Sequence, residues 1–455
     1  MSINDTIVAL ATPPGRSGIG VIRLSGSSSL EITRLIIADE NFTPPPRRTT
    51  LKKIRDPRNA QVIDQALITY FKAPHSFTGE DVVELSCHGS PTLLLHVIDA
   101  LLRFGARVAE AGEFTLRAVS NGQLDLSQAE AVRDLVNART FAAVRQASKQ
   151  LGGELSHRLQ PVKDALLGVI VLLESSLEFV EDDLPPGVVD EAAQSLLQLA
   201  VDLKYLADTF RTGRFFTDGL RVTLVGRPNV GKSSLFNCLV ARDRAIVTEV
   251  PGTTRDSLSE LVDIDGLLVM ITDTAGLHDS SDAVERLGIE RTRRALADSD
   301  LIAVVLDGSQ DIADEDLEII AEVSEKTHLF VINKSDLQPS PLKPNNVLLA
   351  KTNAILVSAK TGFGIDALRS AILHPFTQNV PIDNDFLITD ARHFDLLQRA
   401  ANAISSSSDL LAERASEEIC LVGLHNALRF LGEITGETTS DDILMRIFKT
   451  FCIGK

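Results

Sequence analysis

The chain has 455 residues and a formal net charge of −17, so its length suits about three domains that each bury a hydrophobic core. It has four cysteines and no C-x-x-C pair, which argues against a disulfide framework or a zinc site. An acidic chain presents no broad cationic face, so any contact with RNA must be local or shared with a partner.

Residues 1–120 are predicted to form an α+β domain, because β-rich runs such as Gly20 to Leu24 and Val62 to Phe71 alternate with turn clusters. The amino terminus has no basic region followed by a long apolar run, so we expect a cytoplasmic protein. One basic cluster comprises Arg47, Arg48, Lys52, Lys53, Arg55 and Arg58, opposed there only by Asp56. We interpret it as a solvated loop after Pro44 to Pro46, with a binding patch as the alternative.

Residues 121–216 are predicted to be helical, because apolar residues recur at helical spacing at Leu166, Val169, Ile170, Leu173 and Leu177. Pro161 is expected to interrupt or kink this stretch, and Pro185 to Gly187 to end its last helix. A further helix is expected from Glu191 to Phe210. The run Ala165 to Leu173 has only nine residues against the ~20 that span a bilayer, so we expect a buried helix and no membrane contact.

A specific motif lies at Gly226 to Ser233, which matches G-x-x-x-x-G-K-[ST] and follows the apolar run Leu220 to Val225. A strand, a glycine loop and a helix in this order point backbone N–H groups at a polyphosphate. Lys232 would then reach the β- and γ-phosphates, and the Ser233 hydroxyl would ligate Mg²⁺. The sequence therefore predicts a nucleoside triphosphate site.

Three further motifs follow apolar strands. Asp273 to Gly276 places a carboxylate where it can hold Mg²⁺ through water. In the segment Asn333 to Asp336, the Asp336 carboxylate can accept hydrogen bonds from the N1–H and the exocyclic amine of guanine, a pair of donors that adenine does not have. Ser358 to Lys360 would supply an N–H to the guanine oxygen. Together the motifs resemble a Ras-like GTPase domain at residues 217–376 and favour GTP over ATP.

Two features distinguish this domain from a signalling switch. Leu277 stands where Ras-type proteins carry the glutamine that positions water, so another group must orient the nucleophile. Glu285, at the start of the amphipathic segment Ala283 to Ala297, is the acidic candidate for this role, with a solvated helix carboxylate as the alternative reading. Asn229 and the segment Thr248 to Asp256 offer an amide oxygen and several carbonyls, which suit a monovalent cation acting in place of an arginine finger.

Residues 377–455 are predicted to be helical again, with helices at His393 to Ala403 and Leu410 to Leu431 and a turn at Ser405 to Ser408. We expect both helical flanks to form one domain, into which the GTPase domain is inserted. An apolar stripe of Leu444, Ile447, Phe448 and Phe451 should dock the last helix. Cys452 is then held just after that helix, where a packing role is the default reading.

Several of these segments resemble the MnmE (TrmE) family of tRNA-modification GTPases: the phosphate loop, Pro251 to Asp256 and the terminal Phe451 to Lys455. Asp5 to Arg16 and Ser76 to Asp81 are similar to the same family's amino-terminal domain, so the resemblance covers the whole chain. It implies a multidomain α/β and α+β fold, in which a Ras-like P-loop GTPase domain is inserted into a helical domain and preceded by an α+β folate-binding and dimerisation domain.

The resemblance also implies an activity. A homodimer would hydrolyse GTP with Mg²⁺ and K⁺, and would act with the flavoprotein MnmG (GidA), which alone carries FAD. Together they would add an aminomethyl or carboxymethylaminomethyl group at the 5 position of a tRNA wobble uridine. The carbon would come from 5,10-methylenetetrahydrofolate, with 5-formyltetrahydrofolate as the other folate considered.

Roles for particular residues follow from the same resemblance. Folate contacts fall on Arg23, Glu80, Lys455 and Gln123, where Gln replaces a family lysine and loses its charge. The Mg²⁺ ligands would be Ser233 and Thr254, and the K⁺ ligands Asn229, Thr248, Val250 and Thr253. Glu285 would orient water, and Cys452 would take part in modification in a role that stays open. The residues expected to bind GTP are Asn229, Val230, Gly231, Lys232, Ser233, Ser234, Thr248, Glu249, Val250, Pro251, Gly252, Thr253, Thr254, Asp273, Thr274, Ala275, Gly276, Asn333, Lys334, Asp336, Ser358, Ala359 and Lys360.

Two other classes of protein share parts of this pattern. A ribosome-assembly GTPase has the same phosphate loop and Thr-Thr-Arg-Asp segment, but normally adds a basic RNA-binding domain or a second GTPase domain. Here residues 377–455 carry 12 acids against 7 bases, and no second phosphate loop occurs. A GTPase that only switches conformation is the other alternative, and Leu277 argues against a Ras-type cycle.

Overall fold

The computed structural model describes residues 5–178, 186–243, 259–273, 295–337, 354–377, 386–439 and 441–454. The chain divides into two compact units. The first comprises Met1–Arg133, Gln150–Ala165 and Leu428–Lys455, and the second comprises Asp134–Lys149 and Leu166–Ala427.

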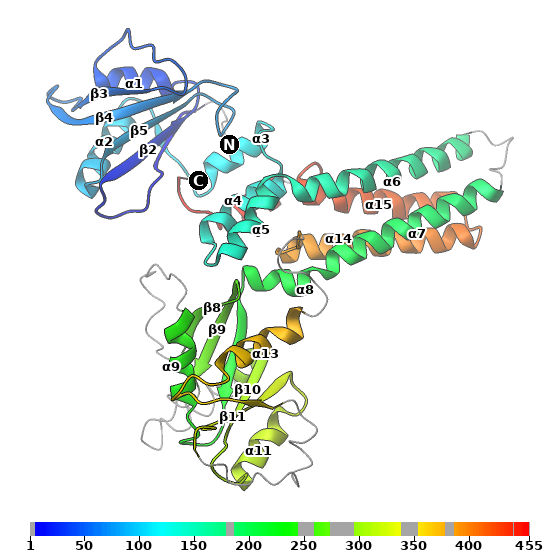
Figure 1. The fold of residues 1–455 in the computed structure, drawn as a ribbon. Helices are drawn as coiled ribbons and strands as arrows, with labels where there is room; N and C mark the ends of the chain where they lie inside the picture. The colour runs from blue at the N-terminus through cyan, green and yellow to red at the C-terminus, as the bar shows by residue number, and fades with distance from the viewer. Residues whose placement is uncertain are drawn as a thin grey trace. The chain divides into compact units, whose positions relative to one another are not determined.

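A six-stranded sheet with the order β3-β4-β5-β2-β1-β6 forms the centre of the first unit (Figure 1). Its strands are β1 (Ile7–Leu10), β2 (Ile19–Ser25), β3 (Thr49–Arg55), β4 (Val62–Phe71), β5 (Val82–His88) and β6 (Arg107–Val108). All neighbours pair antiparallel except β1 and β6, which are parallel. Helices α1 (Ser29–Ile37) and α2 (Pro91–Arg103) bury Ile36 and Leu101 against sheet residues such as Ile22 and Leu85, so one face of the sheet lies in the core.

The carboxyl-terminal tail also belongs to the first unit. Helices α3 (Glu113–Ser120), α4 (Leu126–Asn137) and α16 (Asp441–Phe448) complete this part of the fold. Phe448 and Phe451 pack with Leu126 and Ala129, and Leu444 and Ile447 pack against the same cluster. Beyond it, Ile453 forms an antiparallel bridge with Ala111. The expected docking of the last helix is confirmed.

The second unit contains a six-stranded sheet with the order β12-β11-β10-β7-β9-β8. Its strands are β7 (Leu220–Val225), β8 (Ser259–Ile264), β9 (Leu267–Asp273), β10 (Leu301–Asp307), β11 (His328–Asn333) and β12 (Ile355–Leu356), and only β8 and β9 pair antiparallel. Every residue of β10 is buried, as expected for a central strand of a parallel sheet.

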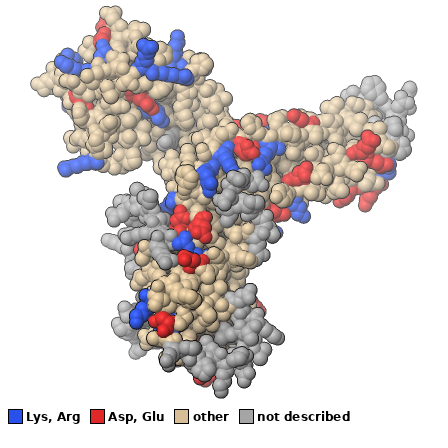
Figure 2. All heavy atoms as spheres, viewed as in Figure 1, with Lys and Arg blue, Asp and Glu red and all other residues tan. Residues whose placement is uncertain are grey.

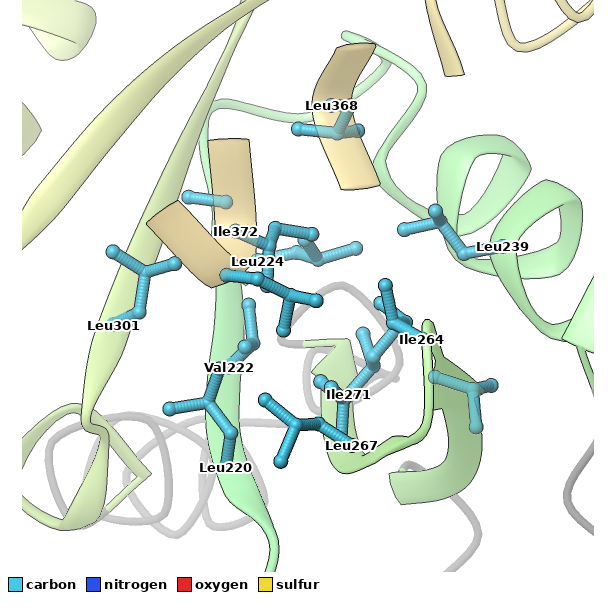
Figure 3. Close-up of a cluster of buried hydrophobic side chains, with 14 of the residues drawn as sticks. Leu220, Val222, Leu224, Leu239, Ile264, Leu267, Ile271, Leu301, Leu368 and Ile372 are labelled. Atoms are coloured by element: carbon cyan, nitrogen blue, oxygen red, sulfur yellow. The ribbon is translucent and has the colours of Figure 1, made fainter. Parts of the chain in front are cut away.

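Helices cover both faces of this second sheet. Helices α9 (Lys232–Asp243) and α13 (Ile365–Thr377) pack Leu239, Leu368 and Ile372 onto β7 and β10, in the cluster shown in Figure 3. Helix α11 (Asp314–Val323) covers the other face, where its Val323 packs with Ile302 and Val304 of β10. This doubly wound arrangement confirms the predicted α/β class of the GTPase-like segment.

Further helices are α5 (Phe141–Leu151), α6 (Glu154–Glu178), α7 (Pro186–Asp208), α8 (Phe210–Gly213) with the short 3₁₀ helix η1 (Arg214–Phe216), α14 (Ala391–Ala412) and α15 (Glu417–Thr435). Helices α7 and α14 lie on either side of the second sheet in sequence, yet they run side by side (Figure 1). The predicted insertion between two helical flanks therefore agrees with the chain path, while the exact domain boundaries stay predictions.

Two local expectations were wrong, and a third was wrong in part. Ser405 to Ser408 is no turn, because it lies within α14, where Ser408 Oγ donates to the Ala193 carbonyl oxygen at 2.7 Å. Small hydroxyl side chains here let two helices approach closely. Helix α6 runs through Pro161, so the proline does not interrupt it, while a kink stays a prediction. Pro161 is exposed, so water can satisfy the carbonyl left without a partner. Pro186 begins α7, where its missing N–H would be unpaired in any case.

The basic segment after Pro44 to Pro46 was also mispredicted, because it forms strand β3 instead of a loop. Leu51 pairs with Leu67 of β4, and Ile54 is fully buried, which ties the strand to the core. Among the residues that the structure describes, none of the helices combines the length and apolar character needed to cross a membrane.

Candidate functional site

The loop from Gly226 to Gly231 joins the end of β7 to the start of α9. A Cβ atom at Gly226 would lie 2.3 Å from the Val305 carbonyl oxygen, so only glycine lets the loop pass this close to β10. Asn229 adopts φ 64°, a left-handed conformation that asparagine tolerates better than most residues. The sequence thus shapes a tight loop in front of a helix N-terminus.

Lys232 is 6% exposed and points back into this loop. Its Nζ donates to the carbonyl oxygens of Gly226 at 2.7 Å and Arg227 at 3.0 Å. Burial lowers the pKa of the ammonium, and the Asp273 carboxylate opposes that shift. Because the hydrogen-bond partners of this ammonium are neutral carbonyl oxygens, an anion bound at this position would stabilise its charge strongly.

Ser233 and Asp273 meet at the edge of the sheet where β9 ends. The Ser233 hydroxyl donates to Asp273 Oδ2 at 2.6 Å, and the carboxylate side chain is buried. A hydroxyl and a carboxylate are hard oxygen donors of the kind Mg²⁺ prefers. These two residues therefore fit a magnesium site beside the phosphate loop.

The segment after β11 forms a second cluster. Asn333 is 2% exposed and connects two loops, since its Nδ2 donates to the Val230 carbonyl oxygen and its Oδ1 accepts from the Ala359 N–H. The Asp336 carboxylate accepts from Ser358 Oγ at 2.7 Å, a hydrogen bond that lowers the pKa of Asp336. The exposed carboxylate is thus anionic at neutral pH and able to accept hydrogen bonds from a base.

Two ion pairs hold this region together, and sequence reasoning missed both. Lys334 Nζ lies 2.7 Å from Asp307 Oδ2 and also donates to the Asn229 carbonyl oxygen. Arg227 Nε lies 3.2 Å from Asp316 Oδ2, and the Asp316 side chain is 2% exposed. In the sequence, the only indication of the first ion pair is that Asp307 ends an apolar strand. The only indication of the second is that Asp316 is an acid in the first turn of a helix.

In the first unit, the structure brings together Arg23 and the loop that carries Glu80. The Arg23 guanidinium pairs with Glu84 at 2.8 Å and lies over the Phe77 ring. Ser25, two residues along β2 on the same face, donates to Glu80 Oε2 at 2.7 Å. Gln123 lies beside this loop, because a Cβ atom at Gly79 would be 3.2 Å from its Cγ.

A buried charge network supports Glu80, and no motif in the sequence indicates it. Arg117 is 5% exposed, and its Nη1 donates to both Glu80 carboxylate oxygens at 3.1 and 3.2 Å. Its Nη2 donates to Asp5 and Glu113. The hydrogen bond from Arg107 is the main cause of the lowered pKa of Asp5. The network fixes the position of the Glu80 carboxylate through hydrogen bonds from Arg117 and Ser25.

The carboxyl-terminal tail ends at this cluster. Arg23 Nη1 donates to the Gly454 carbonyl oxygen at 3.5 Å, and the Gly112 N–H donates to the Cys452 carbonyl oxygen at 3.4 Å. The Cys452 side chain is exposed. The other predicted site residues, namely Thr248 to Thr254, Thr274 to Gly276, Glu285 and Lys455, lie outside the described residues.

Comparison with known proteins matches two family models to successive parts of the chain. A family model described as the MnmE helical domain matches residues 126–452, and one described as the GTP-binding protein TrmE N-terminus matches residues 6–123. Proteins named tRNA modification GTPase MnmE from Koribacter versatilis and Syntrophus aciditrophicus are each 42% identical, and that from Aquifex aeolicus is 40% identical. Each similarity covers 100% of both chains.

Proposed function

The chain belongs to the MnmE family of tRNA modification GTPases, and we propose that it uses GTP hydrolysis to drive the modification of a wobble uridine in tRNA. The observation that carries the proposal is full-length similarity to relatives that share this name. The phosphate loop and the strand-end clusters supply the matching chemistry, so the chain is a GTP hydrolase that takes part in tRNA modification.

GTP would bind with its phosphates against the start of α9. Lys232 would exchange its two carbonyl partners for phosphate oxygens, which are stronger acceptors for a buried ammonium. Mg²⁺ would be held by Ser233 and Thr254, with Asp273 accepting from a metal-bound water, and would neutralise charge on the phosphates during transfer. The Gly276 N–H is the further donor proposed for the γ-phosphate.

Guanine would lie against the cluster that follows β11. Asp336 would accept from the two guanine donors, and the N–H groups of Ser358 to Lys360 would face the guanine oxygen. Asn333 supports this pocket indirectly, since its amide connects the Val230 and Ala359 backbones. Adenine presents no matching donor pair, so this geometry favours GTP.

Hydrolysis is proposed to need K⁺, with ligands from Asn229, Thr248, Val250 and Thr253. Asn229 is exposed, and its side-chain amide makes no hydrogen bond within the described ranges, which leaves the oxygen available for a cation. A cation there would place positive charge where the transition state accumulates negative charge. GTP turnover should therefore fall when KCl is replaced by NaCl at equal ionic strength, and equal rates would contradict the cation site.

The modification itself is proposed to use a one-carbon unit from tetrahydrofolate, bound at Arg23, Glu80, Gln123 and Lys455 in a homodimer. The match of residues 6–123 to the family's amino-terminal model supports this placement. A flavoprotein, MnmG, is proposed to supply the FAD, and the complex is expected in the cytoplasm. Cys452 is proposed to take part in the modification: it follows a docked helix, lies one residue before the bridge to Ala111 and two residues before Gly454, whose carbonyl oxygen accepts from Arg23.

Mass spectrometry of wobble uridines in cells lacking the protein tests the proposal directly. Loss of the 5-substituted nucleoside is expected, with recovery from the unaltered protein and no recovery from Asp336→Asn. A ribosome-assembly GTPase is the alternative function. Normal wobble uridines together with accumulated ribosomal precursors would favour that alternative.

A further inference from the structure

Strand β3 is the outer edge of the first sheet, since β4 is its one partner among the described strands. Residues 47–58 carry six cations and one acid in a chain whose net charge is −17. Figure 2 shows Lys and Arg side chains gathered over the end of the first unit where Figure 1 places β3. Positive charge is therefore segregated on this edge.

Five of the six cations of this edge fall into two groups, and the sixth, Arg47, donates through Nη2 to the His75 carbonyl oxygen at 3.1 Å. Lys52 Nζ lies 2.8 Å from Asp39 Oδ2, and Arg58 Nε lies 3.2 Å from Asp56 Oδ1, so both charges are compensated. Arg48, Lys53 and Arg55 form no ion pair with any residue that the structure describes. The uncompensated charges are the ones available to an external polyanion.

Lys53 and Arg55 lie on the face opposite the buried Ile54, although the pairing of β3 with β4 shifts register between Ile54 and Arg55. Side chains two residues apart in a strand are separated by about 6.7 Å along it, whereas Lys52 points to the opposite face. On the face of Lys53 lie its cross-strand partner Gln65 and the exposed Leu51 and Leu67, and none of these is acidic. With this spacing, Lys53 and Arg55 are able to contact successive phosphates of one nucleic-acid strand.

We propose that the edge formed by β3 and the loop before it is a docking surface for the phosphate backbone of tRNA, with Arg48, Lys53 and Arg55 as its phosphate contacts. The proposal rests on the proposed function, which supplies tRNA as the substrate. An acidic protein must concentrate its RNA contacts in such a place, because the rest of its surface repels phosphates. The backbone of Arg47 anchors the loop, since its N–H donates to the Tyr70 carbonyl oxygen at 2.7 Å.

The test compares two double variants that remove the same charge. Lys53→Gln with Arg55→Gln removes two uncompensated cations, and Lys52→Gln with Arg58→Gln removes two paired ones. Binding of an in vitro transcribed tRNA with uridine at the wobble position is measured by filter retention from 50 to 300 mM KCl, after thermal melting has shown both variants to be folded. GTP hydrolysis without tRNA should be unchanged in both, because β3 lies outside every GTP motif.

We expect the first variant to bind about tenfold or more weakly at ~0.1 M salt, with the slope of log K against log salt reduced by about 1.4–1.8 for two lost phosphate contacts. The control variant should keep the slope of the unaltered protein. Equal losses in the two variants would overturn the proposal, because net charge alone would then account for binding. Unchanged binding would assign the cations to protecting a sheet edge from pairing.

The proposed function fails by a different result. If the unaltered protein does not retain the transcript, yet its absence from cells still abolishes wobble modification, the docking surface is wrong and the proposed function stands. If modification persists without the protein, the proposed function is wrong whatever binds to β3.

Discussion

Arg227→Met removes a guanidinium that holds the phosphate loop to helix α11. Arg227 Nε lies 3.2 Å from Asp316 Oδ2, with the two side chains 18% and 2% exposed, and Nη2 donates to Gln310 Oε1 at 2.9 Å. Asp316 Oδ2 also accepts from the Ala313 N–H at 3.0 Å. After the substitution, the Ala313 N–H is the one donor among the described residues that still bonds to the buried Asp316 carboxylate.

The expected loss of stability follows from that burial. Breaking a buried ion pair by removing one partner destabilises by about 3–5 kcal/mol. Arg227 is partly exposed, its Nε makes no hydrogen bond to Asp316, and the Ala313 bond is retained, so we expect the lower end, about 3 kcal/mol. For a domain of about 150–250 residues, each 1 kcal/mol shifts Tm by about 2–4 °C, which gives a fall of roughly 6–12 °C.

Calorimetry of the full chain measures this fall. The relevant transition is the one that moves upward when GDP and Mg²⁺ are added, because a ligand stabilises the domain that binds it. The matched control adds Asp316→Asn to Arg227→Met, which removes the stranded charge but keeps an acceptor for the Ala313 N–H. This double variant should recover most of the loss. A single variant within ~1 °C of the unaltered protein, or a double variant as unstable as the single one, would refute the reasoning.

Two further predictions concern the nucleotide. Asp336→Asn should weaken GTP binding by about 100-fold or more, because an amide N–H then faces guanine donors, while a xanthine nucleotide should bind better; unchanged GTP affinity would remove Asp336 from the base pocket. Glu285→Ala should leave nucleotide affinity intact and lower kcat about 100-fold, as expected for a group that orients water in the transition state; normal turnover would redirect the search to Asp279 and Asp282.

The strand-end motifs can be predicted from sequence because each is a continuous segment. An apolar run followed by Asp273, Asn333 or Ser358 fixes both the strand and the position of the side chain at its end. Parallel pairing then brings these ends to one edge of the sheet, so residues far apart in sequence meet without any further signal. Local periodicity and sheet geometry together account for this agreement.

Two of the misses depend on partners distant in sequence, and a third depends on the position of a strand in its sheet. Ser408 reads as part of a polar turn until Ala193, 215 residues away, offers it a carbonyl oxygen inside a helix pair. Arg227 and Asp316 read as solvated charges, because nothing near either one indicates that Asp316 is 2% exposed. The strand at Thr49 to Arg55 was obscured by its charges, since an edge strand tolerates cations that a central strand does not.

The carboxyl-terminal tail offers a way to separate the chemistry of Cys452 from its placement. Gly454 adopts φ 96°, and a Cβ atom there would lie 2.4 Å from the Leu10 carbonyl oxygen. Gly454→Ala therefore keeps the thiol but displaces the last residues from β1 and from Arg23. Phe448 and Phe451 stay packed at their cluster, so the rest of the unit should fold normally.

Both Gly454→Ala and Cys452→Ser should spare GTP hydrolysis, because the tail lies outside every GTP motif. If the thiol must be presented beside Arg23, both variants should abolish the 5-substituted wobble uridine when each replaces the unaltered protein in cells. Normal modification by Cys452→Ser would make the cysteine a packing residue. Loss in Cys452→Ser with normal modification by Gly454→Ala would instead mean that the thiol acts without the docked conformation, and the proposed role of tail placement would be wrong.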